Sequence, residues 1–404
     1  MAAGDNSTLQ NNGAITSNSY RAYGMTATSG SDLTNGKTGT ITMNQPYGYG
    51  MAISGTSGTL TNDGAITLNN ISSSGLYAAN SGTSPAAISV TNNGTITGKG
   101  NDNVGISASG SGITVTNGTD GTLNMQGRYN AGIVVNGAGS TVANAGQINI
   151  SGTSGKGAEI FGTGTTFTNT GTITTTGTGS HELSIGNTDG SATGSATLTA
   201  WSVTLSPNQW TDTDSRPIAV GPGSTLNFAN TRLILRPGSA ASGFAFNQRY
   251  NVADMIDNDG TVTGGIGSDV PDAAIAGAMP MLKAQLYGSS ASGAGNQQVS
   301  LSIEPEDNHG QGANSTAVHR AAARMWLLNR TLGNALDALV AASDWTFFIQ
   351  PYYQHSRVTG SASSRSESEG LIFGAARPAG SPTTSPWAGT PDWNTPTPPS
   401  ADMA

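Results

Sequence analysis

Cysteine is absent from this 404-residue sequence, and charged residues are scarce at 10% of the chain. The first absence excludes disulfide frameworks, thiolate metal sites and cysteine nucleophiles. The second lies far below the roughly one quarter that is typical of globular proteins, so a conventional globular enzyme is not expected. The formal net charge is −8 and the 16 lysines and arginines are scattered. Without a basic patch to contact a phosphate backbone, nucleic acid is not an expected partner.

Long hydrophobic runs are missing as well. No stretch of about 18 apolar residues occurs, so the sequence predicts no transmembrane helix. The chain opens on the polar stretch Met1–Asn6, and no signal peptide is recognised in this sequence.

Glycine, in contrast, makes up 57 of the 404 residues, and it marks an internal repeat. A Gly-x-apolar element recurs at intervals of 25 to 30 residues, beginning at residues 13, 39, 64, 94, 121, 146 and 171. A second element, first seen as Tyr23-Gly24-Met25, follows the same period, and a third places an apolar residue two positions before an asparagine. Each period therefore contains three short strand-like segments.

Three strands per coil, separated by Gly and Asn turns, are typical of a parallel β-helix, or solenoid. We predict such a fold, with about 25 residues per coil. We expect the turns to contain Gly because the chain needs a positive φ where it corners. Stacked coils would form an inward ladder of Ile15, Ile41, Ile66 and Ile96, with a hydroxyl ladder of Thr16, Thr42, Thr67 and Thr97 beside it.

One turn slot holds asparagine in all seven regular coils. We interpret it as a structural ladder, in which stacked side-chain amides satisfy backbone groups of the turns. The predicted ladder consists of Asn11, Asn35, Asn62, Asn92, Asn117, Asn144 and Asn169.

The composition changes after residue 303. The polar stretch Glu304–Gly312 precedes residues 315–342, whose apolar side chains recur at helical spacing. An aromatic, strand-like stretch follows at 345–358, and residues 378–404 are rich in proline without strand alternation.

The order of these parts resembles the autotransporter family of Gram-negative bacteria. Members carry an exported β-helical passenger with a stabilising C-terminal section, then a linker helix, then an outer-membrane β-barrel. The matching pieces here are the Asn-x-Gly-x-Ile coils, Ser224–Leu235 with Phe246–Tyr250, the helix Ala317–Leu339 and the stretch Trp345–Tyr353. The resemblance implies an all-β fold class: a parallel β-helix followed by one linker helix and an incomplete β-barrel start.

The resemblance also implies a division of the chain. Only 60 residues run from Trp345 to Ala404, too few for a closed barrel, so we expect a barrel truncated at its start. The expected segments are regular β-helix repeats (1–177), the irregular, stabilising end of the β-helix (178–303), a polar link with the linker helix (304–343), the first barrel strand or strands (344–377), and a Pro-rich tail that is disordered or read out of frame (378–404).

In functional terms, the resemblance implies a surface-exposed or secreted passenger that acts in adhesion, aggregation or biofilm formation. Its location would be the cell surface, the outer membrane or the extracellular space. Expected partners are host-cell or matrix glycans and proteins, or other bacterial cells, and the outer-membrane assembly machinery for a full-length protein. We expect no enzymatic activity, no metal and no cofactor.

Tyrosines near the second element offer a glycan-contact surface, namely Tyr23, Tyr49 and Tyr77; core or edge packing is the alternative role. Two other functions stay open, a polysaccharide-degrading lyase or hydrolase and a passive structural spacer. Asp63 and Asp120 share a turn slot, which we interpret as turn chemistry rather than a catalytic pair. The histidines are too dispersed to predict a metal site; they are His181, His309, His319 and His355.

Overall fold

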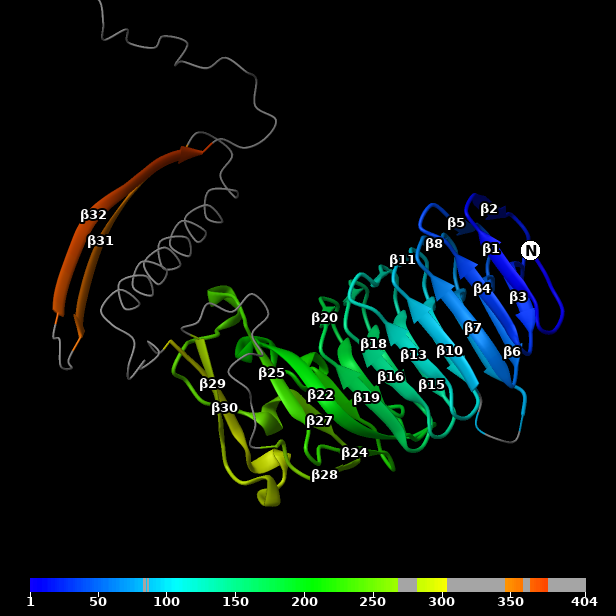
Figure 1. Ribbon diagram of the computed structural model, residues 1–404. Helices are drawn as coiled ribbons and strands as arrows, with labels where there is room; N and C mark the ends of the chain where they lie inside the picture. The colour runs from blue at the N-terminus through cyan, green and yellow to red at the C-terminus, as the bar shows by residue number, and fades with distance from the viewer. Residues whose placement is uncertain (83–84, 86, 268–281, 304–345, 359–363, 377–404) are drawn as a thin grey trace, which may run out of the picture. The chain divides into compact units, whose positions relative to one another are not determined.

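The computed structural model describes residues 1–82, 85, 87–267, 282–303, 346–358 and 364–376 (Figure 1). The chain divides into two compact units, Met1–Glu304 and Pro305–Ala404. The first unit is an all-β parallel β-solenoid of about 8 turns, which confirms the fold predicted from the repeat.

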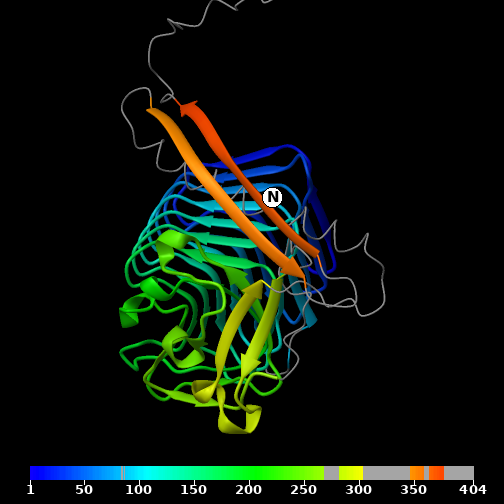
Figure 2. The ribbon, with the colours of Figure 1, turned by 90° about the vertical axis from the view of Figure 1, so that its left-hand side faces the viewer.

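Each regular coil contributes one strand to each of three parallel sheets, and Figure 2 shows the coils stacked along the unit. The first sheet contains β1 (Thr8–Asn11), β4 (Ser31–Asn35), β7 (Ser57–Asn62), β10 (Ala87–Asn92), β13 (Thr114–Asn117), β16 (Thr141–Asn144), β19 (Thr165–Asn169), β22 (Ser195–Leu205), β24 (Thr225–Asn227) and β28 (Thr261–Thr263), with β25 (Arg232–Pro237) paired to β22. The second sheet contains β2 (Ala14–Ser17), β5 (Thr40–Met43), β8 (Ala65–Leu68), β11 (Thr95–Gly98), β14 (Thr122–Met125), β17 (Gln147–Ile150) and β20 (Thr172–Thr175). The third sheet contains β3 (Tyr23–Thr28), β6 (Tyr49–Gly55), β9 (Ser74–Asn80), β12 (Val104–Ser109), β15 (Ala131–Asn136), β18 (Lys156–Ile160), β21 (His181–Ile185), β23 (Ile218–Val220) and β27 (Ile256–Asn258).

The register between coils follows the repeat. Ile41 pairs with Ile15 on one side and with Ile66 on the other, and Ile66 pairs in turn with Ile96. These strands alternate between a buried and a less buried face, as the period-two pattern requires. The isoleucine ladder is buried from Ile41 onward, whereas Ile15 in the first coil is only partly buried. The equivalent threonines lie in register beside it.

The asparagine slot forms one continuous chain of side-chain hydrogen bonds. The Nδ2 of each asparagine donates to the Oδ1 of its equivalent in the next coil at 2.8 Å, through all seven coils from Asn11 to Asn169. Most of these amides donate a further bond to a turn carbonyl, such as that of Gly94 from Asn92. The side chains are at most 6% exposed, so the ladder satisfies polar groups inside the core.

The positive φ expected of turn glycines is found at the corner before the strands of the first sheet, as at Gly30 (75°) and Gly139 (65°), but it does not explain the recurring glycines inside the strands of the third sheet. Gly24, Gly105 and their equivalents do not have a positive φ. Glycine is required at these positions because the backbones of neighbouring coils approach closely. A Cβ added to Gly105 would lie 2.5 Å from the carbonyl oxygen of Gly132 in the next coil. Close backbone approach, rather than left-handed backbone geometry, therefore selects glycine in this slot.

Positive φ also falls on a second corner of the regular coils, before the strands of the third sheet, where most residues are not glycine. The φ angles there lie between 54° and 59°, at Arg21, Tyr47, Ser72, Asp102, Tyr129 and Ser154. Each of these N–H groups donates to a carbonyl of the following coil, as Ser154 does to Thr178 at 2.8 Å. The inter-coil hydrogen bond thus holds side-chain-bearing residues in a conformation that they rarely adopt.

The three sheets do not end together. The second sheet stops at β20, whereas the first and third continue to β28 and β27. Short 3₁₀ helices cover this part of the unit, at η1 (Pro207–Gln209), η2 (Thr213–Ser215), η3 (Ala240–Ser242), η4 (Val252–Met255), η5 (Ser290–Ser292) and η6 (Ala294–Asn296). An antiparallel sheet of β26 (Tyr250–Asn251), β30 (Gln298–Ile303) and β29 (Leu282–Tyr287) follows.

In the second unit, β31 (Thr346–Val358) and β32 (Ser364–Ala376) form an antiparallel pair. The predicted linker helix, within 304–343, lies outside the described residues, as does the Pro-rich tail at 378–404.

We predict that Asn92→Ala destabilises the solenoid by about 2–5 kcal/mol, because it takes from the buried Asn117 oxygen its amide donor and leaves the Asn62 amide only its bond to the Gly64 carbonyl. Asn69→Ala is the matched control, since Asn69 belongs to an exposed amide ladder with Asn44 and should cost less than about 1 kcal/mol. Urea denaturation followed by circular dichroism measures both. Equal losses in the two variants would contradict a structural role for the buried ladder.

Candidate functional site

The three predicted tyrosines lie together on the outer face of the third sheet, in its first three coils. The rings of Tyr23 and Tyr49 stack with centroids 5.1 Å apart, and those of Tyr49 and Tyr77 lie 4.7 Å apart at a tilt of 46°. Tyr23 is 50% exposed, whereas Tyr49 and Tyr77 are intermediate. We call Tyr23, Tyr49 and Tyr77 the tyrosine row.

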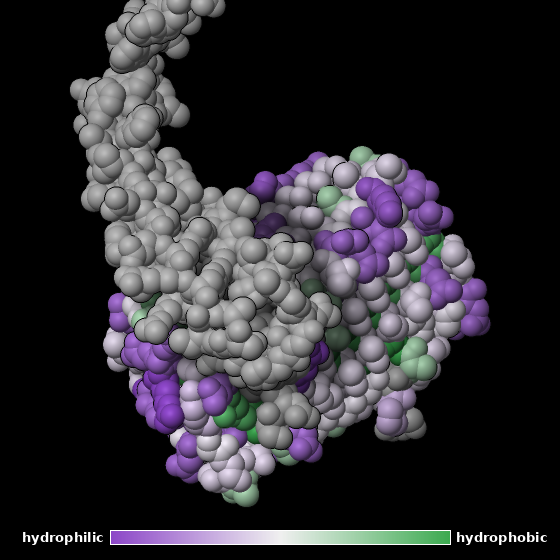
Figure 3. Space-filling view, turned by 60° about the vertical axis from the view of Figure 1, so that its left-hand side comes forward, coloured by the Kyte–Doolittle hydropathy of each residue, from purple (hydrophilic) through white to green (hydrophobic). Residues whose placement is uncertain are grey.

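A second aromatic pair lies in the same coils. Tyr20 and Tyr47 meet edge to face at 5.3 Å, and the guanidinium of Arg21 lies 5.3 Å and 5.8 Å from their ring centroids. Tyr20 and Tyr47 are 57% and 41% exposed. Four of the six large hydrophobic residues that are exposed in the described part of the chain are tyrosines of the regular coils. Figure 3 shows one face of the molecule, on which hydrophilic surface and apolar patches alternate. The tyrosines therefore form a distinct exposed feature of the regular coils.

Other candidates from the sequence are not brought together into a site. Asp63 accepts a hydrogen bond from Asn93 at 2.9 Å, and Asp120 lies exposed in a longer turn. His181 is buried, His355 lies in β31, and His309 and His319 lie outside the described residues. No group of three or more histidine, aspartate or glutamate side chains in the described part of the chain could hold a metal ion.

The structure points to a residue that the sequence analysis missed. The glycine slot of the third sheet is filled by Gly24, Gly50, Gly75, Gly105, Gly132 and Gly157, and the next coil places Glu182 there. The 25-residue step from Gly157 to Glu182 continues the repeat, so following the period beyond residue 177 would have found it. A residue that departs from an otherwise constant local rule is a candidate functional residue.

The carboxyl group of Glu182 is buried without full compensation. The side chain is 8% exposed, and its Oε2 has no hydrogen-bond partner. Arg236 is the cation that favours the charged form of Glu182, but its own hydrogen bonds go elsewhere. Its Nε donates to Ser202 Oγ at 2.7 Å, and a terminal amino group donates to the carbonyl of Gly171 at 3.1 Å. The indole N–H of Trp201 favours the charged form of Glu182 but does not meet Oε2 in hydrogen-bond geometry.

Burial therefore dominates the protonation of Glu182. It raises the pKa of this carboxyl to about 8, against the opposing effects of Arg236 and Trp201. At neutral pH the group is mainly a neutral acid, which can both donate and accept a hydrogen bond.

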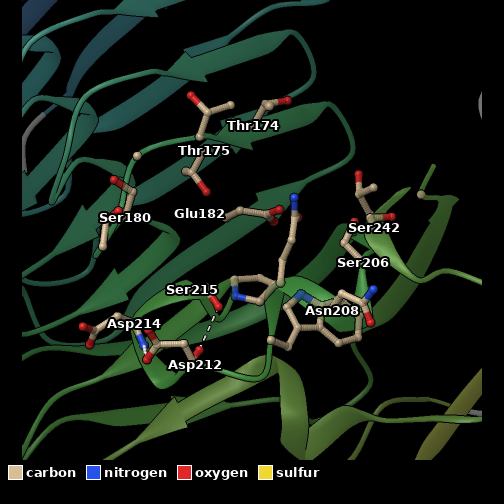
Figure 4. Close-up of a pocket in the computed structure, with 18 of the residues that line it drawn as sticks. Thr174, Thr175, Ser180, Glu182, Ser206, Asn208, Asp212, Asp214, Ser215 and Ser242 are labelled. Atoms are coloured by element: carbon tan, nitrogen blue, oxygen red, sulfur yellow. Dashed lines mark hydrogen bonds between the residues drawn. The ribbon is translucent and has the colours of Figure 1, made fainter. Parts of the chain in front are cut away.

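Glu182 lines a cleft of about 670 Å³ (Figure 4). One wall is formed by β20 and the turn after it, with Thr174 and Thr175. The opposite side comes from η1, η2 and η3, which contribute Asn208, Asp214 and Ser242. The cleft exists because the second sheet ends at β20, so no described strand covers that edge.

A second buried titratable group, His181, lies beside Glu182 in sequence. Its Nδ1 lies 2.8 Å from the carbonyl oxygen of Arg216, and its side chain is 3% exposed. Burial, and then the neighbouring charge of Lys156, lowers the pKa of His181 to about 4. Burial also lowers the pKa of Lys156, whose Nζ donates to the carbonyl of Gly179 at 3.2 Å. His181 is therefore neutral at physiological pH and is held by backbone contacts.

No protein-family model, curated protein or solved structure matches this chain. None of the described helices is long and apolar enough to cross a membrane. The candidate sites are therefore interpreted from their own chemistry.

We predict that Glu182→Gln changes how stability depends on pH. Because the pKa is raised from 4.5 to about 8 on folding, the folded protein keeps a proton that the unfolded chain releases. The stability contribution is complete below pH 4.5 and is lost as pH rises toward 8, by a few kcal/mol in total. The variant should lack this loss, so it should become the more stable protein toward pH 8.

Denaturation of both proteins at several pH values measures this effect as a difference. His181 acts in the opposite direction, since its lowered pKa costs stability as pH falls from 6.5 toward 4, but it is present in both proteins and cancels. Parallel stability curves for wild type and variant would show that Glu182 does not titrate as inferred.

Proposed function

We propose that the chain is the passenger part of an autotransporter-like surface protein, which acts in adhesion, aggregation or biofilm formation at the cell surface or outside the cell. The observation that carries the proposal is the tyrosine row on a long, repetitive solenoid with few charged residues. Exposed tyrosines supply large contact area together with a hydroxyl group, and they stack on the apolar faces of sugars.

The solenoid form suits a function of many weak contacts. Its coils present equivalent side chains at the strand spacing of about 4.8 Å, so contacts repeat along the axis. When several such proteins meet several ligands on a cell, weak individual contacts multiply through avidity. Partners in this proposal are host-cell or matrix glycans and proteins, or other bacterial cells.

The strands of the second unit are consistent with display on an outer membrane. β31 and β32 are each 13 residues long and antiparallel, which exceeds the 9 to 11 residues or so that a tilted membrane strand needs. In this proposal they are the start of the membrane anchor, and residues 304–343 supply the linker helix.

A polysaccharide-degrading enzyme is the second candidate function. It is favoured by one observation, the buried carboxyl of Glu182 in a cleft that also holds Asp212 and Asp214. Glycoside hydrolases use such an acid together with a carboxylate. A passive structural spacer is the remaining alternative, and it requires neither the tyrosine row nor the cleft.

We predict that replacing Tyr23, Tyr49 and Tyr77 together by Ser lowers binding on a glycan array or to cultured cells at least tenfold, because the stacking surface is lost. Tyr129→Ser is the matched control, since Tyr129 is 55% exposed but contacts Arg128 rather than the row. Circular dichroism verifies that both variants fold. Unchanged binding by a folded triple variant would remove the basis of the glycan-contact proposal.

The adhesion proposal also predicts no turnover. Incubation of the full chain with polygalacturonate and with neutral polysaccharides should produce neither new reducing ends nor unsaturated products. Release of either product, and its loss in Glu182→Gln, would instead establish the enzyme.

A further inference from the structure

We propose that the cleft between β20 and the η1–η3 segments is a binding site for an uncharged saccharide, with Glu182 as its buried polar contact. This inference does not depend on the tyrosine row or on surface display, since the cleft and the tyrosine row lie in different coils of the solenoid.

The first argument is that the repeat does not explain Glu182. Six preceding coils place glycine in this slot, where a Cβ would meet the backbone of the next coil, as at Gly132 with the carbonyl oxygen of Gly157 at 2.5 Å. The slot of Glu182 lies next to Pro217, one residue before the pairing of Leu183 with Ile218. The coil after β21 thus accepts a long side chain where earlier coils accept none, and that side chain lines a cleft.

The second argument is the unpartnered Oε2 of Glu182. A buried polar atom without a hydrogen bond is costly, and native structures rarely retain one without a reason. Arg236 and Trp201 do not supply the missing bond in the described residues. A ligand hydroxyl that enters the cleft would supply it, and the protonated carboxyl can donate a second bond in return.

The third argument is the chemistry of the walls. Hydroxyl and amide groups form much of the polar part of the walls, from Thr174, Thr175, Ser206, Asn208 and Ser242. Each of these groups both donates and accepts hydrogen bonds, which is the pattern that a polyhydroxylated ligand requires. Ile173, Trp210 and two prolines form an apolar part of comparable extent, on which the apolar faces of sugar rings can pack.

Charge selects among saccharides. Asp212 and Asp214 line the cleft, and no lysine or arginine does so among the described residues. Uronates, sulfated sugars and phosphorylated ligands would therefore meet like charges without a counter-ion. The volume of about 670 Å³ lies within the range of small-molecule sites, so a short neutral oligosaccharide is the ligand class that fits.

The test is saturation-transfer NMR on the full chain with a panel of neutral trisaccharides of glucose, mannose, galactose and N-acetylglucosamine. Trigalacturonate and an extended peptide serve as probes of the other ligand classes. We expect at least one neutral trisaccharide to bind, with weaker or no binding of the other two probes. The inference is overturned if no neutral trisaccharide binds, or if trigalacturonate or the peptide binds more tightly.

Variants then locate the site. Glu182→Gly restores the residue that the repeat uses and should lower the affinity of the bound trisaccharide at least tenfold. Thr174→Ala and Asn208→Ala, both at exposed positions of the cleft, should each lower it severalfold and guard against a Glu182 variant that does not fold. The triple tyrosine variant should bind as wild type does. Unchanged affinity in the folded cleft variants would overturn the assignment, whereas a loss in the tyrosine variant would place the saccharide on the row instead.

Discussion

The structure depends on the in-register stacking of coils at the spacing of a parallel β-sheet. Because the strands of adjacent regular coils pair in register, each residue lies above its counterpart, and any side chain that fits one coil must fit its neighbours. Glycine is selected where backbones of adjacent coils nearly touch, and asparagine is selected where one amide can donate to the next. The low charge of the chain follows as well, since stacked like charges would repel one another at about 4.8 Å.

The same constraint explains why an exception carries information. A Glu in the glycine slot is incompatible with the stacking of the regular coils, so it is tolerated only where the stacking changes. That change occurs where the second sheet ends and 3₁₀ segments replace its next strand. One local loss of the repeat therefore has three consequences: the second sheet ends, Glu182 finds space, and the cleft forms. The backbone strain at the left-handed corners, by contrast, recurs in the regular coils and is held by inter-coil bonds.

The unit thus offers two different kinds of surface. The regular coils carry the tyrosine row, a shallow and repetitive feature that suits many weak contacts. The irregular end carries a cleft with a buried acid, a feature that suits one ligand held by directed hydrogen bonds. An adhesive surface protein can use both, the first for avidity and the second for selectivity.

The period of the sequence by itself determined the solenoid, its three strands per coil and the positions of the isoleucine and asparagine ladders. This was possible because parallel in-register stacking converts a one-dimensional repeat directly into contacts, as with Asn62 and Asn92. The sequence pattern explained the glycines of the turns but not those inside the strands, because the approach of one backbone to another depends on the packing of two coils and not on local turn geometry. Only the tertiary structure decided the cleft. Its walls come from residues as far apart as Thr174 and Ser242, and the burial that raises the pKa of Glu182 arises from elements that follow no repeat.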